Sequence, residues 1–336
     1  MKIRIKYLII ALNLFIFFVF VYLLIDPHRF RASLIRTKEV GNTENLYKSP
    51  ELMSEYFQFE NISELSQFRN FISNNLIKND NDFITSVNIL NFLGDYYYDN
   101  KVINKIKVPE YPDLILNELK YYKVRGTCYN DATLYITLVQ SIGIKARYVS
   151  FLGRDGYGLN GHALTEIYSQ KYKKWILIDP QQVAYFIDNK TKIPLSALEI
   201  RKYALELKEP EFYKNVIINQ NKVGNVVKKE DIYDFYKLSV DIVFPNFNNY
   251  QSLVNNNIIY KISHYFSSKR ITSGIIFNEE LSRFLRSFFD KNRVNYRISD
   301  KYSPDIAYDC YYLMFHILFI IWILGFIYLI VIRLLK

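Results

Sequence analysis

The chain has 336 residues, enough for one large or two modest domains. Its formal net charge is +10, but the Lys and Arg residues are mostly scattered singly, which argues against a nucleic-acid-binding protein. A basic surface near anionic lipid or acidic polysaccharide is the simpler interpretation of this charge. Two cysteines cannot form a disulfide framework, and no group of Cys, His and carboxylate residues has metal-ligand spacing, so neither a cofactor nor a metal is expected.

Two apolar segments near the ends of the chain predict membrane-spanning helices. Residues 7–25 are interrupted only by Asn13, and residues 311–332 contain His316 as their one ionisable side chain apart from tyrosines. At about 1.5 Å of rise per residue, helices of this length cross a hydrocarbon core of about 30 Å. A cleaved signal peptide is the alternative for the first segment, but no small-residue cleavage site follows it.

Basic residues at the two chain ends set the expected orientation. Positive charge is retained on the cytoplasmic side of a membrane, so both tails are expected in the cytoplasm. The basic residues at the two chain ends are Lys2, Arg4, Lys6, Arg333 and Lys336. Arg29, Arg31, Arg36 and Lys38 argue for the opposite orientation, but they open a very long loop, where the rule loses force. We therefore expect an integral membrane protein whose central region is extracytoplasmic, which means periplasmic if the chain is bacterial.

Apolar residues at helical spacing predict helices in the first part of the central region. Two helices are expected within residues 49–75, with a break near Asn61. Asp82 is placed to cap the next helix, over Phe83–Tyr98. Pro112 suits the first turn of a short helix, Pro112–Leu119.

A further helix and a set of strands follow. One apolar stripe predicts a helix over Cys128–Ile142, ended by Gly143. The elements expected after it are a strand at Arg147–Phe151, a glycine-rich loop at Gly153–Gly161, strands at Ala163–Tyr168 and Lys174–Ile178 joined by a polar hairpin, and a helix at Pro194–Leu207.

The pattern weakens after Glu209. Strands at Val240–Phe244 and Ile258–Ile262 and a helix at Asn278–Asn292 are expected there. Residues 210–310 therefore either complete the preceding domain or form a small second one.

Three residues have the chemistry of a thiol nucleophile and its helpers. Cys128 lies at an expected helix N-terminus, where unpaired backbone N–H groups and the helix dipole favour a thiolate. His162, at the start of a strand, can pair with that thiolate and later protonate a leaving amine. Asp179, at the end of the paired strand, can fix the imidazole tautomer. The alternatives are an inert buried thiol, a core histidine and a turn aspartate.

Four motifs in this order resemble the transglutaminase-like core, a branch of the papain-like superfamily. They are G-x-C-x-x-x-A at Gly126–Ala132, G-I-x-A-R at Gly143–Arg147, G-H-A-x-x-E at Gly161–Glu166 and W-x-x-x-D-P at Trp175–Pro180. The resemblance covers roughly residues 65–205. It implies Cys128 as nucleophile, His162 as base and Asp179 as orienting residue. It also implies an α+β fold in which the nucleophile's helix packs on an antiparallel sheet, with Arg147 and Trp175 in structural roles.

The sequence departs from the family pattern beside the motifs. Asn130 stands where many members have an acidic residue, and Leu164 replaces a common aromatic residue, a change that could alter the wall of an acyl pocket. The backbone N–H of Cys128 is one candidate oxyanion donor, and the side chain of Tyr121 or Tyr122 is a second candidate.

These expectations divide the chain into seven parts. They are a cytoplasmic tail (1–6), a transmembrane helix (7–25), a juxtamembrane linker and helix (26–64), a transglutaminase-like domain (65–209), a C-terminal extension or small second domain (210–310), a transmembrane helix (311–332) and a cytoplasmic tail (333–336).

The expected function is that of a membrane-anchored thiol enzyme acting on amide bonds outside the cytoplasm. Hydrolysis of a protein or peptide substrate (protease or amidase) is favoured over acyl transfer to an amine. A non-catalytic scaffold in a cell-envelope or surface-polysaccharide assembly is the alternative. Two spans with few polar residues argue against a transporter.

Overall fold

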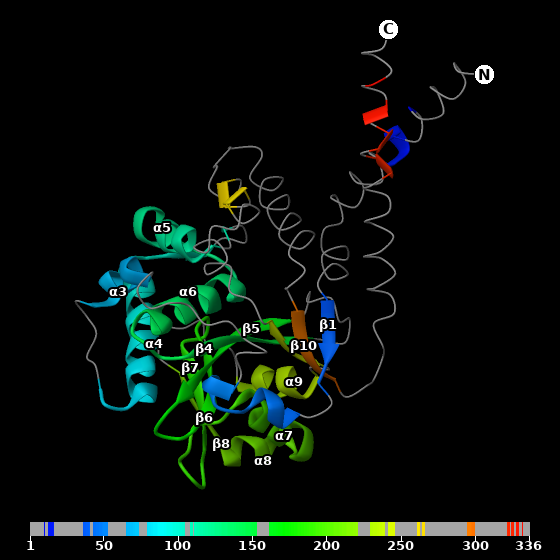
Figure 1. Cartoon of the computed structure of the whole chain (residues 1–336). Coiled ribbons are helices and arrows are strands. Elements are labelled where there is room, and N and C mark those ends of the chain that lie inside the picture. The colour runs from blue at the N-terminus through cyan, green and yellow to red at the C-terminus, as the bar shows by residue number, and fades with distance from the viewer. Residues whose placement is uncertain are drawn as a thin grey trace.

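One long sheet with helices on both faces organises the chain (Figure 1). The computed structural model describes residues 10, 13–16, 36–40, 43–52, 65–73, 79–104, 108–109, 111–152, 161–220, 229–238, 241–245, 261–262, 264–265, 294–299, 321–322, 324–325, 327–328 and 331.

Eight of the described strands pair in the order β1-β10-β9-β4-β5-β6-β7-β8. Each neighbouring pair is antiparallel except β1 and β10, which are parallel. A separate short parallel pair joins β2 (Ile103–Asn104) to β3 (Val124–Arg125). The strands of the long sheet are β1 (Arg36–Glu39), β4 (Ala146–Leu152), β5 (His162–Ser169), β6 (Lys174–Asp179), β7 (Ala184–Asp188), β8 (Val216–Gln220), β9 (Asp241–Pro245) and β10 (Val294–Ser299).

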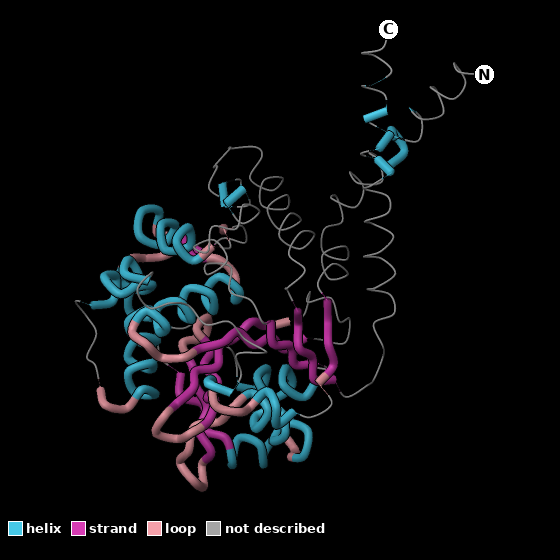
Figure 2. Tube along the Cα trace, viewed as in Figure 1, coloured by secondary structure: helices cyan, strands magenta, loops and turns pink. Residues whose placement is uncertain are grey.

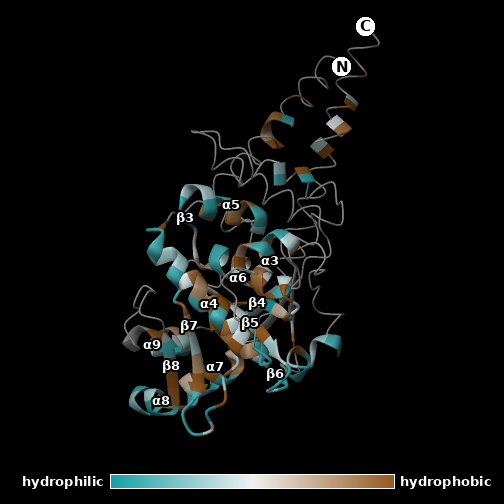
Figure 3. Ribbon diagram, turned by 90° about the vertical axis from the view of Figure 1, so that its left-hand side faces the viewer, coloured by the Kyte–Doolittle hydropathy of each residue, from teal (hydrophilic) through white to brown (hydrophobic). Residues whose placement is uncertain are grey.

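The two faces of the sheet pack into two hydrophobic cores, because side chains alternate between the faces of a strand. On β6, Ile176 and Ile178 belong to the first core, whereas Trp175 and Leu177 belong to the second. The hydrophobic residues accordingly gather between the helices and the sheet, and the outer turns are largely hydrophilic (Figure 3).

Four helices build the first core (Figure 2). They are α3 (Ser66–Ser73), α4 (Asp82–Asp99), α5 (Pro112–Tyr122) and α6 (Cys128–Ser141). α6 lies at the centre of this layer, because it contacts α3, α4 and α5 as well as strands β4 and β5. Every residue of α6 from Asn130 to Ser141 is buried. The expectation that the helix beginning at Cys128 packs on an antiparallel sheet is confirmed.

The second core lies under three further helices. They are α7 (Ala197–Glu206), α8 (Glu209–Asn215) and α9 (Lys229–Leu238). Two short 3-10 helices from the N-terminal part of the chain, η1 (Thr43–Leu46) and η2 (Pro50–Leu52), precede α3. Leu46 of η1 is fully buried in this second core, so residues far upstream of the motifs help to cover the sheet.

Most of the helices and strands expected up to Glu209 are present, although some begin at a different residue than expected. The cap of α4 is Asn81, whose Oδ1 accepts a hydrogen bond from the N–H of Phe83, rather than Asp82 alone. Asp82 also accepts a hydrogen bond from Ser169, and so ties α4 to the turn after β5. The helix expected from Pro194 begins only at Ala197, because Ser196 is its N-cap.

The sheet continues beyond Glu209. β8 pairs with β7, and β9 pairs with β4, so described strands of residues 210–310 extend the same sheet. The strand expected at Val240–Phe244 is β9, but residues 261 and 262 are helical, so the strand expected at Ile258–Ile262 is wrong there. The loop residues 153–160 and the helix expected at Asn278–Asn292 lie outside the described residues.

The described residues include no helix that is long and apolar enough to cross a membrane. The segments 7–25 and 311–332 lie mostly outside the described residues. Where both are described, a Cβ atom built on Gly325 would fall 2.3 Å from Nδ2 of Asn13. The two ends of the chain therefore lie side by side at this point (Figures 1 and 2).

Candidate active site

Cys128 is the first residue of α6, and neighbouring side chains hold the helix start in place. Oδ1 of Asn130 accepts a hydrogen bond of 3.0 Å from the backbone N–H of Thr127, the N-cap residue. Nδ2 of Asn130 donates to the carbonyl of Pro109 at 2.8 Å. An acidic side chain at this position could accept the first bond but, once ionised, could not donate the second. The amide therefore ties the start of α6 to the connector before α5.

The position of the Asn130 side chain also explains why a glycine, Gly126, lies two residues before Cys128. A Cβ atom on Gly126 would lie 2.1 Å from Oδ1 of Asn130, so a larger residue would displace this cap. Cys128 itself is a free, half-buried thiol. The N–H groups of the first turn of α6 favour negative charge at this place.

His162 and Asp179 meet at the end of the β5–β6 hairpin. His162 is the first residue of β5 and Asp179 is the last residue of β6. Nε2 of His162 lies 2.7 Å from Oδ2 of Asp179. The register pairs Thr165 with Ile178, which brings the start of β5 beside the end of β6. The expectation that the outer ends of this hairpin lie side by side is confirmed.

Cys128 lies close enough to the same imidazole to affect its ionisation. Since Asp179 engages Nε2, Nδ1 is the ring nitrogen left for the thiol. Burial disfavours the charged imidazole, but the charge and hydrogen bond of Asp179, together with the contact of Cys128, raise the pKa of His162 to about 10. The geometry thus brings together all three residues expected from the sequence, and the raised pKa of His162 favours the protonated imidazole at neutral pH.

The turn after β6 holds Asp179 by its second oxygen. Oδ1 of Asp179 accepts a hydrogen bond of 3.1 Å from the backbone N–H of Gln182. The next residue, Val183, has a φ of 50°, which is strained for a β-branched side chain. Val183 is nevertheless buried, and its Cγ1 lies 3.0 Å from where a Cβ atom on Gly94 of α4 would be. Packing of Val183 on α4 therefore fixes the turn that orients the carboxylate.

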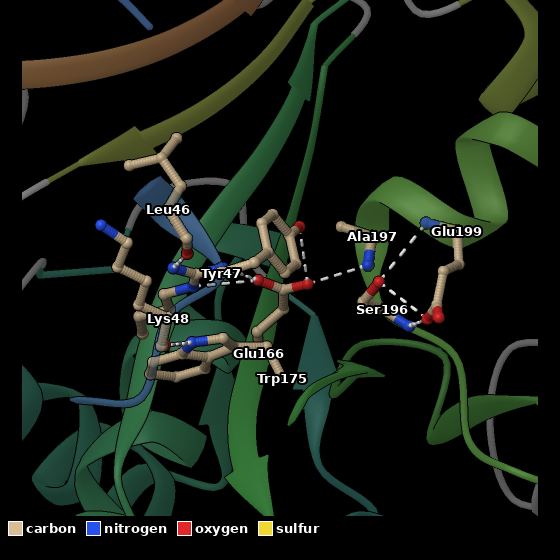
Figure 4. Close-up of polar contacts among 9 residues, drawn as sticks. Leu46, Tyr47, Lys48, Glu166, Trp175, Ser196, Ala197 and Glu199 are labelled. Atoms are coloured by element: carbon tan, nitrogen blue, oxygen red, sulfur yellow. Dashed lines mark hydrogen bonds and ion pairs between the residues drawn. The ribbon is translucent and has the colours of Figure 1, made fainter. Parts of the chain in front are cut away.

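Two other charged residues of the motifs, Arg147 and Glu166, pair with each other. Arg147 of β4 and Glu166 of β5 form an ion pair with an N···O distance of 2.6 Å, and Arg147 also stacks 4.1 Å from the Trp175 ring centroid. Oε1 of Glu166 accepts hydrogen bonds from the Tyr47 hydroxyl at 3.0 Å and from the Ala197 N–H at 2.8 Å (Figure 4). This cluster links the N-terminal segment, the sheet and α7, which accords with the structural role expected for Arg147 and Trp175.

Asp131, which the sequence patterns did not single out, is a buried acid near Cys128, His162 and Asp179. It lies one turn into α6 and is 1% exposed. Its Oδ1 accepts a hydrogen bond of 3.3 Å from the Tyr97 hydroxyl, and its Oδ2 lies 3.9 Å from NH1 of Arg125. A carboxylate inside an otherwise apolar helical stripe was the available sequence signal.

The remaining sequence-derived candidates have different surroundings. Leu164 is fully buried in the second core, so it is a packing residue rather than the wall of an open pocket. Tyr121 and Tyr122 are 70% and 53% exposed on the last turn of α5, and an oxyanion role for either stays a prediction. Cys310 lies outside the described residues, and the described residues contain no metal-binding group of His, Cys, Asp and Glu.

Comparison with known protein families gave one match. The model of the transglutaminase-like superfamily matches residues 88–180, which run from α4 to the residue after β6 and contain Cys128, His162 and Asp179. No curated protein and no solved structure matched the chain. Members of this superfamily are often cysteine-dependent enzymes. Residues 88–180 of this chain form a transglutaminase-like superfamily domain.

Proposed function

We propose that the chain is a thiol enzyme that attacks amide bonds with Cys128, assisted by His162 and Asp179. The observation that carries the proposal is the arrangement around one imidazole. Oδ2 of Asp179 lies 2.7 Å from Nε2 of His162, and the thiol of Cys128, at a helix N-terminus, lies close enough to the same ring to raise its pKa. A nucleophile, a base within hydrogen-bond reach and a third group that orients the base form the pattern of covalent catalysis.

The proposed reaction begins with an ion pair. The Cys128 thiolate attacks the acyl carbon, and the carbonyl oxygen becomes an oxyanion that the N–H groups of the first turn of α6 can stabilise. His162 then gives its proton to the leaving nitrogen as the C–N bond breaks, which leaves a thioester on Cys128. Asp179 holds the ring in one orientation through both transfers.

The second half of the reaction releases the acyl group. Neutral His162 takes a proton from water, whose oxygen attacks the thioester carbon, and the C–S bond breaks to restore the thiolate. The product is then a carboxylic acid, and the enzyme is a protease or amidase acting on a protein or peptide. Attack by an amine in place of water would give acyl transfer by the same steps.

Labelling of the thiol tests this proposal. We expect iodoacetamide to label Cys128 in the full chain at least about tenfold faster than in a His162→Ala variant near neutral pH, because the imidazolium stabilises the thiolate. The matched control is His264→Ala. His264 also lies 2.7 Å from a carboxylate, Asp113, but at the start of α5. Equal labelling rates in wild type and His162→Ala would sink the proposal.

Genetic complementation separates an enzyme from a scaffold. If Cys128 performs chemistry, a Cys128→Ala chain should fail to restore the phenotype of a deletion strain while accumulating to normal levels. Full restoration by Cys128→Ala would favour the non-catalytic scaffold in an envelope or surface-polysaccharide assembly.

We also propose that the chain is anchored in a membrane by residues 7–25 and 311–332, with the domain between them outside the cytoplasm. The apolar length of both segments and the contact between Asn13 and Gly325 support this arrangement. The chain should remain in the membrane pellet after alkaline carbonate extraction, and added protease should digest the central domain from the outer side. Release of the intact chain by carbonate would contradict the anchor.

A further inference from the structure

Helix α9 reaches the proposed triad from outside the family-matched region. Its residues, Lys229–Leu238, follow the end of the match at residue 180. The ring centroid of Phe235 nevertheless lies 5.7 Å from that of His162, and the two rings are nearly perpendicular at 82°. This is the edge-to-face arrangement that aromatic pairs prefer. The imidazole is therefore contacted by Asp179 and by Phe235, and its pKa is also affected by Cys128.

Tyr236, the next residue of α9, fills the space behind this contact. It is 2% exposed, and its ring lies 4.9 Å from Phe151 of β4 and 5.6 Å from Phe186 of β7. Burial, followed by the negative charge of Asp179, raises the pKa of Tyr236. Tyr236 is thus close enough to Asp179 to be affected by its charge, and α9 covers both members of the His162–Asp179 pair.

Ordinary core packing is the competing explanation, because Phe235 also contacts Phe151 at 6.0 Å. Two observations go beyond it. The imidazole of His162 is 17% exposed and the carboxylate of Asp179 is 6% exposed, although both stand at the end of a hairpin where strands commonly meet solvent. In addition, Leu164 occupies the position where the resemblance expects an aromatic residue, and α9 contributes Tyr233 and Tyr236 to the same core.

We propose that Phe235 is a positioning residue for His162, and that α9 keeps water from the hydrogen bond between His162 and Asp179. The proposal rests on the proposed function of Cys128. Phe235 limits rotation of the imidazole, so that Nε2 stays with Asp179 and the opposite nitrogen faces the thiol. The residues after the matched domain are then part of the catalytic unit rather than an appendage.

The charges around His162 determine in which direction its pKa should move when the Phe235 ring is lost. The groups that face His162 are Cys128 and Asp131 from α6 and Asp179 from β6, while Tyr236 of α9 lies near Asp179. Burial lowers the pKa of His162, but attraction to its partners outweighs burial and raises it to about 10. Water weakens both effects. Loss of the Phe235 ring should therefore move the pKa of His162 down, toward its ordinary value.

The test is the pH profile of thiol labelling by iodoacetate, an anionic reagent whose reaction is favoured by a neighbouring imidazolium. In the full chain, we expect Phe235→Leu to slow labelling near neutral pH by roughly three- to tenfold and to shift the alkaline limb to lower pH. Phe235→Tyr keeps the ring and should restore both the rate and the limb. Phe212→Leu is the matched control, because Phe212 is fully buried in the same core and packs on Tyr213 and Tyr233.

The outcomes separate the inference from the function beneath it. Undiminished labelling in His162→Ala would overturn both. Slow labelling in His162→Ala together with an unchanged profile in folded Phe235→Leu would overturn the positioning role alone. A shift of equal size in Phe212→Leu would also overturn it, because general loosening of the core would then be sufficient. Thermal unfolding of each variant shows that the chain compared is folded.

Discussion

Two arginine–carboxylate pairs buried within the described part of the chain differ in how well their atoms are bonded. Arg147 and Glu166 are 1% and 0% exposed, and their N···O distance is 2.6 Å. The side chains of Arg125 and Asp131 are 9% and 2% exposed, but NH1 of Arg125 lies 3.9 Å from Oδ2 of Asp131. Both oxygens of Glu166 accept hydrogen bonds, whereas Oδ2 of Asp131 has no hydrogen-bond partner among the described residues.

This difference separates a structural pair from one that is coupled to the proposed site. A buried ion pair offsets the cost of burying its charges only with close geometry and bonded polar atoms, which Arg147 and Glu166 have. Burial raises the pKa of Asp131 to about 7, although Arg125 and the hydrogen bond from Tyr97 lower it. The charge of Asp179 raises it further and that of His162 lowers it, so the ionisation of Asp131, the acid of the loose Arg125–Asp131 pair, is coupled to both charges.

Breaking the close pair should have the largest effect. Glu166→Ala leaves the Arg147 guanidinium buried without its carboxylate and removes the acceptor for Tyr47 and Ala197. We expect a loss of about 3–5 kcal/mol in the free energy of unfolding, measured by urea denaturation. The double variant Arg147→Met/Glu166→Leu should recover much of this loss, because no charge is then stranded. A loss below about 1 kcal/mol in Glu166→Ala would contradict the assigned role.

Removing Asp131, the acid of the loose pair, should change how the free energy of unfolding depends on pH. Because the pKa of Asp131 is raised from 3.8 to about 7, the folded chain holds a proton that the unfolded chain releases. The stability from this proton is fully present below pH 3.8 and is lost as the pH rises through about 7. Asp131→Asn should remove this dependence, which amounts to about 4 kcal/mol of unfolding free energy between these two pH values.

The control for Asp131→Asn is the second pH window. His162, whose pKa is also raised, contributes stability that is present below its ordinary value and lost as the pH rises toward about 10. Asp131→Asn should leave most of that alkaline loss in place, whereas His162→Ala should abolish it. An unchanged curve between pH 3.8 and about 7 in Asp131→Asn would show that Asp131 is ionised at all these values.

Local patterns were sufficient to predict the parts of the site that depend on neighbouring residues. The start of α6 at Cys128 follows from one helical stripe with Gly126 before it, and the β5–β6 hairpin follows from two apolar runs around a polar turn. The hairpin register alone brings the start of β5 to the end of β6. The proximity of His162 and Asp179 therefore needed only short-range information.

The residues that were missed depend on partners far away in the chain. Phe235 meets His162 only because β9 pairs with β4 and α9 packs on α7, and no local pattern encodes either pairing. Asp131 fits a helix equally well with or without a role, since its neighbours Tyr97 and Arg125 come from other elements. β7 and β8 were also missed, although each has five residues like β9, which was predicted.

The smallest expected effects compare the two tyrosines that donate to the buried carboxylates. The Tyr47 hydroxyl lies 3.0 Å from Glu166, and the Tyr97 hydroxyl lies 3.3 Å from Asp131. Tyr47→Phe should cost about 1 kcal/mol of unfolding free energy at any pH near neutral, because it removes one bond from a charged acceptor. Tyr97→Phe removes a bond that lowers the pKa of Asp131, so the acid can respond by retaining its proton. Its cost should therefore be smaller below about pH 7 than above it, and parallel costs for the two variants across this pH would remove the distinction between the close and the loose pair.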